Sequence, residues 1–231
     1  MPASPLDALC QKEVACRRCP RLVEWRETVA AERRAAYSQE VYWGRPVPGF
    51  GDPSARLVVV GLAPAAHGAN RTGRIFTGDR SGDWLWAALW RAGLATQPES
   101  VSADDGLQAV GTWVTAVVRC APPANRPTPQ ERDNCLPYLE AELALLPARA
   151  VLALGAFAYE GCCRVLGVKK RPAFGHGVEV PTDRGISIVC SYHPSQQNTF
   201  TGRLTVGMLD TVVQRAWELA RGADAGPARP L

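Results

Sequence analysis

The sequence predicts a three-layer α/β/α sandwich around a central sheet of four parallel strands. Three observations lead to this fold class. Short apolar runs bounded by turn residues alternate along the chain with segments of helical period. The runs have no polar face, as is typical of strands buried on both sides. A helix-length segment separates each run from the next, and a crossover between parallel strands requires such a segment.

The amino-terminal part of the chain is expected to be helical and then irregular. Residues 1–36 have helical character that is interrupted at "CRRCPR". Residues 37–55 are rich in proline, glycine and aromatic residues, which favour loops. The first strand is expected at 56–62, "RLVVVGL", and a helix at 82–94, where apolar residues recur at helical spacing.

The alternation of strand and helix then continues to the end of the chain. A second strand is expected at 112–118, and the next helix, 128–146, begins with a capping box in which Thr128 is the N-cap and Glu131 its partner. The remaining elements are a third strand at 150–155, a helix at 156–167, a fourth strand within 185–195 that runs into a loop, and a last helix at 201–221. We expect one domain over 1–221 and a flexible tail at 222–231.

Composition places the protein among soluble intracellular proteins. The formal net charge is +4, and most of the 26 basic residues are arginine, which suits contacts with phosphate. A GC-rich genome would give the same arginine bias. No apolar run approaches the ~20 residues that cross a bilayer, and the start of the chain is too polar for a secretion signal. The expected location is the cytoplasm.

The cysteine pattern predicts a metal centre. Cys16 and Cys19 form a C-x2-C pair, while Cys120 follows a predicted strand and Cys135 lies on the next helix. Four thiolates suit zinc or an iron–sulfur cluster, and the spacing does not choose between them. We expect the metal to hold the amino-terminal helices against the sheet. The other four cysteines are interpreted as packing residues: Cys10, Cys162, Cys163 and Cys190. Cys10, six residues before Cys16, has a second interpretation as a spare ligand.

Two segments that follow strand ends carry a family resemblance. "GLAPAAHGANRTGRIFTGD" and "YHPSQQN" resemble the two active-site motifs of the uracil-DNA glycosylase superfamily. The four cysteines match its iron–sulfur branches, and "GLAPA" with "RCAPPANRPTPQE" looks like family 5, the type B enzymes. The resemblance covers about residues 10–220. It implies a four-stranded parallel sheet, a [4Fe–4S] cluster and excision of uracil, with hypoxanthine and xanthine as further bases.

The motif departs from the better-known families at Ala63, where others carry Asp or Asn to position water. The departure is compatible with the chemistry, because cleavage of a base from deoxyribose passes through a sugar cation and a departing base anion. Stabilising that anion can replace activation of a nucleophile. We therefore expect His193 to donate a hydrogen bond to the leaving base and Phe76 to stack on it.

The other candidate residues have weaker assignments. Asn125 offers a donor and an acceptor to a base edge or acts as a turn residue. Asp79 positions water, steadies the sugar cation or caps the following helix. His67 faces the water or a phosphate, and the backbone amides near Ala63 and Ala65 orient the water.

The DNA contacts are expected around the same loops. Arg71, Arg74 and Ser195 are candidates for phosphate contact. Gln196, Gln197 and Asn198 are candidates for entering the minor groove beside the flipped nucleotide. The expected partner is DNA that contains deaminated bases, bound by a monomer associated with the nucleoid.

Two other functions fit parts of the sequence. A non-catalytic nucleic-acid-binding module stabilised by zinc keeps the cysteines and arginines but gives His193 and Phe76 no task. A phosphate-binding α/β hydrolase needs a carboxylate pair near the loops, and the sequence offers only Asp79 and Asp83, without a Walker motif.

Overall fold

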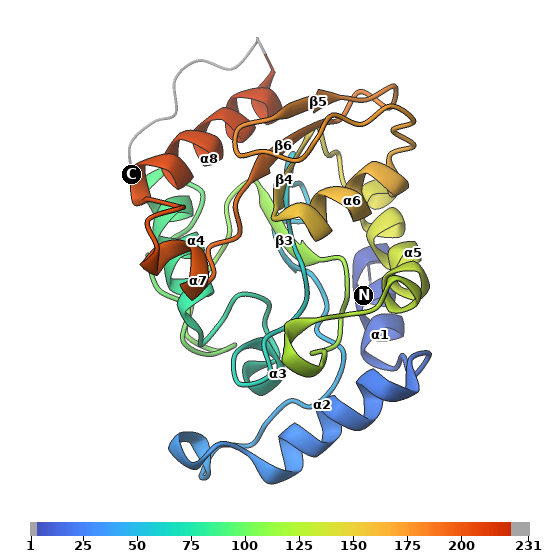
Figure 1. The fold of residues 1–231 in the computed structure, drawn as a ribbon, viewed down its shortest axis with the longest axis vertical. Helices are drawn as coiled ribbons and strands as arrows, with labels where there is room; N and C mark the ends of the chain where they lie inside the picture. The colour runs from blue at the N-terminus through green and yellow to red at the C-terminus, as the bar shows by residue number, and fades with distance from the viewer. Residues whose placement is uncertain (1–3, 223–231) are drawn as a thin grey trace.

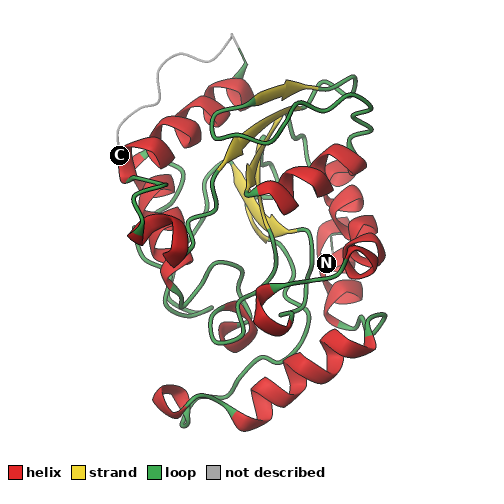
Figure 2. Ribbon diagram, in the orientation of Figure 1, coloured by secondary structure: helices red, strands yellow, loops and turns green. Residues whose placement is uncertain are grey.

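A six-stranded mixed sheet lies between two layers of helices (Figures 1 and 2). The structure is a computed structural model that describes residues 4–222. The strand order is β1-β3-β2-β4-β6-β5. The strands are β1 Phe50–Gly51, β2 Leu57–Gly61, β3 Thr112–Ala116, β4 Ala150–Leu154, β5 Glu179–Pro181 and β6 Ser187–Ser191.

Helices α4 and α8 cover one face of the sheet, and α1, α5 and α6 lie on the other side (Figure 1). The helices are α1 Pro5–Val14, α2 Pro20–Glu32, α3 Ala69–Thr72, α4 Arg80–Arg91, α5 Pro129–Leu145, α6 Ala156–Val165, α7 Gln196–Phe200 and α8 Val206–Arg221. Two 3-10 turns lie at Ala35–Tyr37 and Pro123–Asn125. Within residues 4–222, no helix is long and apolar enough to cross a membrane.

The predicted four parallel strands are confirmed as the centre of the sheet. β3, β2, β4 and β6 pair in parallel, and their buried side chains alternate between two cores. The edge strands β1 and β5 were not expected, because runs of two and three residues are too short to show a period. Both pair antiparallel with their neighbours.

The predicted starts of α5 and α6 agree with the structure, and those of α4 and α8 differ from it. In the capping box of α5, the Thr128 hydroxyl accepts from the Glu131 amide at 3.2 Å, and the Glu131 carboxylate accepts from the Thr128 amide at 2.7 Å. The last long helix begins at Val206 rather than at 201, because Thr205 is its N-cap and α7 with a turn precedes it. The expected tail lies outside the described residues, apart from Gly222.

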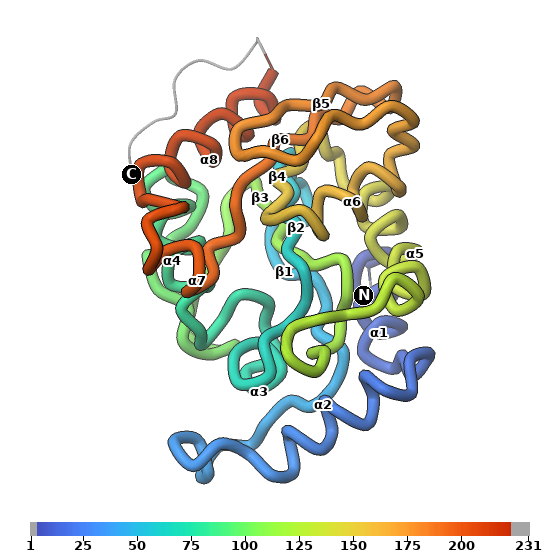
Figure 3. Tube along the Cα trace, in the orientation of Figure 1, coloured from blue at the N-terminus to red at the C-terminus, as the bar shows by residue number. Residues whose placement is uncertain are grey.

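The parallel arrangement places the loops of both sequence motifs at one edge of the sheet. Parallel strands end on the same side, so the segments after β2, β3 and β6 leave the sheet together. Figure 3 shows the chain running from β2 towards α3 and from β6 towards α7, at the same end of the molecule. This edge is the place to look for chemistry.

A buried ion network attaches the amino-terminal helix to the sheet layers. Arg119 follows β3 and donates to the Glu142 carboxylate of α5 at 2.5 Å, and its Nε lies 3.4 Å from a carboxylate oxygen of Glu13 in α1. Trp113 and Thr115 also donate to Glu142, at distances of 2.9–3.1 Å. All three charged side chains are at most 2% exposed. Burial raises the pKa of Glu13, and the charge of Arg119 opposes that shift.

Replacing Glu142 by alanine is expected to lower the free energy of unfolding by about 3 kcal/mol, because a buried cation loses its acceptor. Glu140→Ala in the same helix is the matched control, since Glu140 is exposed and should change stability by less than about 0.5 kcal/mol. Urea unfolding of both variants measures the difference. Equal losses would show that the network does not stabilise the fold.

Candidate active site

The Phe76 and His193 rings lie next to each other at the carboxyl edge of the sheet. Phe76 comes from the loop between β2 and α4, and His193 follows β6 by two residues. Their ring centroids are 5.9 Å apart, and the ring planes are inclined by 30°. The two sequence motifs therefore contribute side chains to one candidate site.

The backbone holds the Phe76 ring in place. Phe76 has a φ of 50°, a conformation that residues with a side chain rarely adopt. Its carbonyl accepts a hydrogen bond from the Trp86 indole at 2.8 Å. Its ring lies against Gly61, where an added Cβ would come within 2.6 Å of the ring. Glycine at the end of β2 is therefore what allows the ring to lie against the strand.

His193 is held in its neutral form. Desolvation by burial lowers the pKa of His193 to about 4. Among residues 4–222, no side chain or backbone group makes a hydrogen bond to its ring. Asn198 donates to the His193 carbonyl at 2.9 Å and so ties the backbone to α7. The imidazole is thus a neutral group on an anchored backbone, and its N–H has no acceptor among residues 4–222.

Asp79 caps α4 with one oxygen and faces the first motif with the other. Its Oδ1 accepts from the amides of Ser81 and Gly82 at 2.9 and 3.1 Å. Its Oδ2 lies so close to Gly68 that an added Cβ there would approach it to 2.1 Å. Burial raises the pKa of Asp79 and outweighs the two amide hydrogen bonds that lower it.

The other predicted residues of the first and middle motifs have environments of their own. His67 shares a hydrogen bond of 3.1 Å with the Tyr42 hydroxyl, and burial lowers the pKa of His67. The amide N–H groups of Ala63 and Ala65 have no hydrogen-bond acceptor within residues 4–222. Asn125 is exposed in a left-handed turn, with a φ of 55°. Asparagine tolerates this conformation, so its amide projects from a fixed turn.

Comparison with known proteins gives the family. The model of the uracil DNA glycosylase superfamily matches residues 48–221. This chain belongs to the uracil-DNA glycosylase superfamily. It is 51% identical over 216 residues to the type-5 uracil-DNA glycosylase of Thermus thermophilus, covering 93% of this chain and 98% of that protein. It is 50% identical over 220 residues to the type-5 enzyme of Pyrobaculum aerophilum, covering 95% and 93%.

More distant members of the superfamily match a smaller part of the chain. The type-4 uracil-DNA glycosylase of Pyrobaculum aerophilum is 32% identical over 127 residues, which is 54% of this chain. The resemblance to the superfamily, stated above from two motifs and a cysteine set, is therefore confirmed. The type-5 relatives match at higher identity and over more of the chain than this type-4 enzyme does.

Arg71 and Arg74, which the sequence suggested as phosphate contacts, are both buried and bound to groups of the protein. Arg71 is 8% exposed, donates to the carbonyls of His67 and Gly78, and pairs with Glu40. Arg74 is 4% exposed and pairs with Asp105 at 2.6 Å. Because both guanidinium groups are buried and bound within the protein, they hold the motif loop rather than a phosphate.

Exposed arginines that sequence reasoning missed lie beside the second motif. Arg80 is the first residue of α4, and its guanidinium lies 4.3 Å from the ring centroid of Phe200. Arg203 lies 4.5 Å from the ring centroid of Tyr192, next to His193. Ser195 is the N-cap of α7, and Gln196 and Gln197 are exposed on its first turn. The position of Arg80 directly after the helix cap Asp79 was the available signal.

The four cysteines singled out by spacing line one small hollow. Cys16 and Cys19 lie between α1 and α2, Cys120 follows β3, and Cys135 belongs to α5. Within the described part of the chain, no three side chains of ligand type are arranged to hold a single metal ion. Of the other cysteines, Cys162, Cys163 and Cys190 are buried in the core, as expected.

Hydrogen-bond donors surround the sulfur atoms of this hollow. Arg26 is 2% exposed, and its guanidinium donates to Cys120 Sγ at 2.9 Å. The Arg119 amide donates to Cys135 Sγ at 3.3 Å, and the Asn134 amide group donates to Cys19 Sγ at 3.5 Å. Burial raises the pKa of Cys120 to about 11, and the charge of Arg26 opposes this shift. Such donors stabilise thiolates, so the residues fit a thiolate-bound metal centre.

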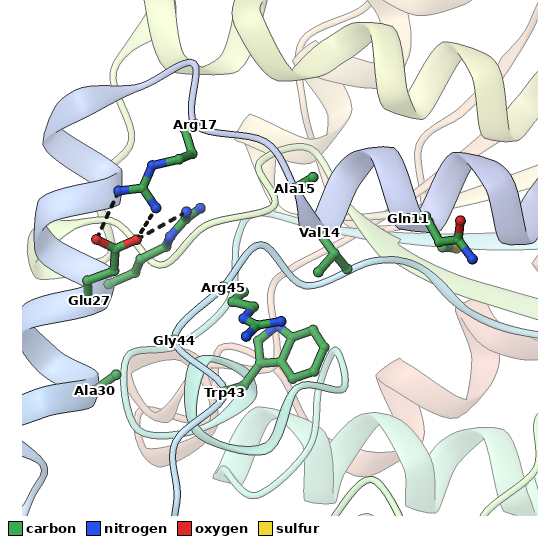
Figure 4. Close-up of a pocket in the computed structure, with 11 residues that line it drawn as sticks. Gln11, Val14, Ala15, Arg17, Glu27, Ala30, Trp43, Gly44 and Arg45 are labelled. Carbon is green, nitrogen blue, oxygen red and sulfur yellow. Dashed lines mark hydrogen bonds and ion pairs between the residues drawn. The ribbon is translucent and has the colours of Figure 1, made fainter.

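A larger hollow of about 680 Å³ lies elsewhere, between α1, α2 and the loop at Trp43 (Figure 4). Arg17 and Glu27 form an ion pair of 2.5 Å at this hollow. None of the predicted catalytic, DNA-binding or metal-binding residues lines it. It is therefore not part of the candidate active site.

His193 should titrate near pH 4 rather than near the ordinary value of about 6.5. Since folding disfavours the protonated ring, its contribution to stability is complete above pH 6.5 and is lost as pH falls towards 4. NMR titration of the imidazole gives the pKa, and urea unfolding at pH 7 and pH 4.5 gives the stability. A His193→Gln variant should lose less stability over that range. A titration midpoint near 6.5 would contradict the desolvated environment.

Proposed function

We propose that this chain is a monofunctional DNA glycosylase that hydrolyses the bond between uracil and deoxyribose in DNA. The observation that carries the proposal is the 5.9 Å approach of the Phe76 and His193 rings. It provides an aromatic surface and a neutral donor for one flipped base. The relatives at 50–51% identity over nearly the whole chain are named uracil-DNA glycosylases, which supports the same activity here.

In the proposed mechanism, His193 stabilises the leaving base. Cleavage builds negative charge on the base oxygens, and the His193 N–H donates a hydrogen bond to them. A neutral imidazole does this without giving up its proton, and the low pKa of His193 keeps it neutral at physiological pH. Phe76 holds the base plane with a ring that lies directly against Gly61 at the end of β2.

Groups of the first and middle motifs position the water and stabilise the charge on the sugar. The free amides of Ala63 and Ala65 orient the water, and the exposed amide of Asn125 contacts a base edge. Asp79 Oδ2, which faces Gly68, steadies the sugar cation. The chain's lysines are Lys12, Lys169 and Lys170, none in a motif loop, so no amine forms the imine that a lyase requires. We also propose that the protein excises hypoxanthine and xanthine from DNA.

We also propose that Cys16, Cys19, Cys120 and Cys135 bind a [4Fe–4S] cluster. Such a cluster, when bound, crosslinks the segments that supply its thiolates and takes no part in base hydrolysis. Two observations support it: the four thiols line one hollow, and Arg26 brings a buried cation to Cys120 Sγ at 2.9 Å. The centre would pin α2 and the Cys16 loop onto β3 and α5. Monomeric action and association with the nucleoid stay predictions.

His193→Ala should reduce the single-turnover rate of uracil release by about ten- to a hundredfold, because one charge-assisted hydrogen bond is lost. Release of free uracil from a uracil-containing oligonucleotide is measured together with DNA affinity, which should be unchanged. The exposed-surface variant Glu140→Ala should keep the wild-type rate. Binding of DNA without any base release by the wild-type protein would favour a non-catalytic nucleic-acid-binding module.

Anaerobically purified protein should contain iron and acid-labile sulfide and absorb in the visible range. Cys120→Ser should lose most of the metal, and Arg26→Met should lower the iron content or the cluster's lifetime in air, because the thiolate loses its cation. Cys163→Ala is the matched control, since Cys163 is buried and does not line the hollow. Zinc in place of iron, or iron retained by Cys120→Ser, would overturn the cluster assignment.

A further inference from the structure

His176 is a half-buried histidine beside the end of β6, on the segment between α6 and β5. Its ring centroid lies 5.3 Å from that of Tyr192, and the two ring planes are inclined by 36°. Its Nδ1 accepts a hydrogen bond from the Tyr192 amide at 3.3 Å. Because Tyr192 directly precedes His193, this hydrogen bond lies one residue from the proposed donor to the leaving base.

The His176 ring continues the pairing of β6 beyond the end of β5, its neighbour at the edge of the sheet (Figure 1). Past β5, the Val178 carbonyl accepts from the Cys190 amide at 2.9 Å, and the Gly177 amide donates to the Cys190 carbonyl at 2.7 Å. Gly177 then turns the chain away, with a φ of 79°. Tyr192 has the next amide on this side of the strand, and the His176 ring accepts from it in place of a carbonyl.

The contact determines where the proton of the His176 ring resides. A backbone amide can only donate, so Nδ1 carries no proton and the neutral ring has its proton on Nε2. Desolvation by burial lowers the pKa of His176, and a backbone hydrogen bond with Met208 in α8 opposes that shift. The ring is therefore neutral at physiological pH and connects the end of β6 with α8.

Other groups hold the residues on either side of Tyr192. The Gly155 amide donates to the Ser191 carbonyl at 2.8 Å, and an added Cβ at Gly155 would lie 3.4 Å from the Cβ of His193. Asn198 donates to the His193 carbonyl at 2.9 Å. Since the His193 ring has no hydrogen-bond partner among residues 4–222, its position depends on that of its backbone. His176 supplies the bond to the one residue of this turn that the others leave unbound.

We propose that His176 is a positioning residue, whose Nδ1 holds the Tyr192 amide and thereby sets where His193 meets a base stacked on Phe76. The proposal rests on the proposed function and on the role of His193 in it. In this role His176 contacts neither the base nor the sugar. It should therefore affect the rate of base release rather than the affinity for DNA, and it should do so only while His193 is present.

The first test measures single-turnover release of uracil by the full-length protein. His176→Phe keeps a planar ring and removes the acceptor, so the rate should fall about five- to tenfold, the scale of one hydrogen bond, with DNA affinity unchanged. His176→Asn offers a carbonyl oxygen in place of Nδ1 and should restore most of the rate. Thr182→Val is the matched control, because it removes a 2.7 Å hydrogen bond to the Ile186 carbonyl at the opposite end of the β5–β6 hairpin. It should keep the wild-type rate.

A double-mutant cycle separates positioning from a general effect on the fold. In the His193→Ala background, His176→Phe should change the rate by less than about twofold, because the side chain to be positioned is gone. Equal losses in both backgrounds would overturn the proposal, since His176 would then support the fold or another group. A wild-type rate for His176→Phe, or an equally slow His176→Asn, would also overturn it.

Nitrogen-15 NMR of the wild-type protein at neutral pH tests the hydrogen bond apart from activity. His176 should have an unprotonated Nδ1 and a protonated Nε2, and Nδ1 should show a coupling to the Tyr192 amide nitrogen across the hydrogen bond. A proton on Nδ1 would overturn the proposal whatever the rates of the variants. If the wild-type protein released no base, the proposed function would fail and the positioning role with it, whereas the NMR result would still show whether His176 holds the end of β6.

Discussion

The contact between Phe76 and Gly61 is the constraint on which the candidate active site depends. The loop must turn through a left-handed residue to bring the ring back over the end of β2, and a side chain at position 61 would occupy the ring's place. A hydrogen bond from Trp86 to the Phe76 carbonyl holds the turn from the side of α4. The ring is therefore positioned by backbone geometry before any substrate arrives, and His193 needs only the parallel pairing of β4 and β6 to reach it.

Two buried arginines, Arg119 and Arg26, have different partners and different roles in this molecule. Arg119 is compensated by carboxylates from α1 and α5, so it joins the amino-terminal helix to the layers around the sheet. Arg26 has a sulfur acceptor instead, with the nearest carboxylate at 3.7 Å. A buried cation whose shortest contact is a thiol favours the thiolate form, and this form is what a metal centre requires. Arg119 thus holds α1 against the layers around the sheet, whereas Arg26 favours the thiolate form of Cys120.

The sequence was sufficient for features set by local pattern and strand order. The four parallel strands, the capping box of Thr128 and Glu131, and the cysteines of one hollow follow from period and spacing. The sequence was insufficient where residues distant along the chain determine whether a side chain is buried or exposed. Arg71 and Arg74 have the sequence context of phosphate ligands, but Glu40 and Asp105, about thirty residues away, draw them into the interior. Strand β1 is too short for any pattern to mark it.

Because several arginines are paired inside the protein, the net charge does not measure how basic the surface near the site is. A value of +4 suggests a mildly attractive surface for DNA. Several arginines near the site are already neutralised, so attraction must come from those left exposed, such as Arg80 and Arg203. Both stack on aromatic rings next to the second motif. Stacking leaves the guanidinium edges free to donate hydrogen bonds. Under the proposed function, these two exposed guanidinium groups bring attraction for the DNA backbone to the second motif.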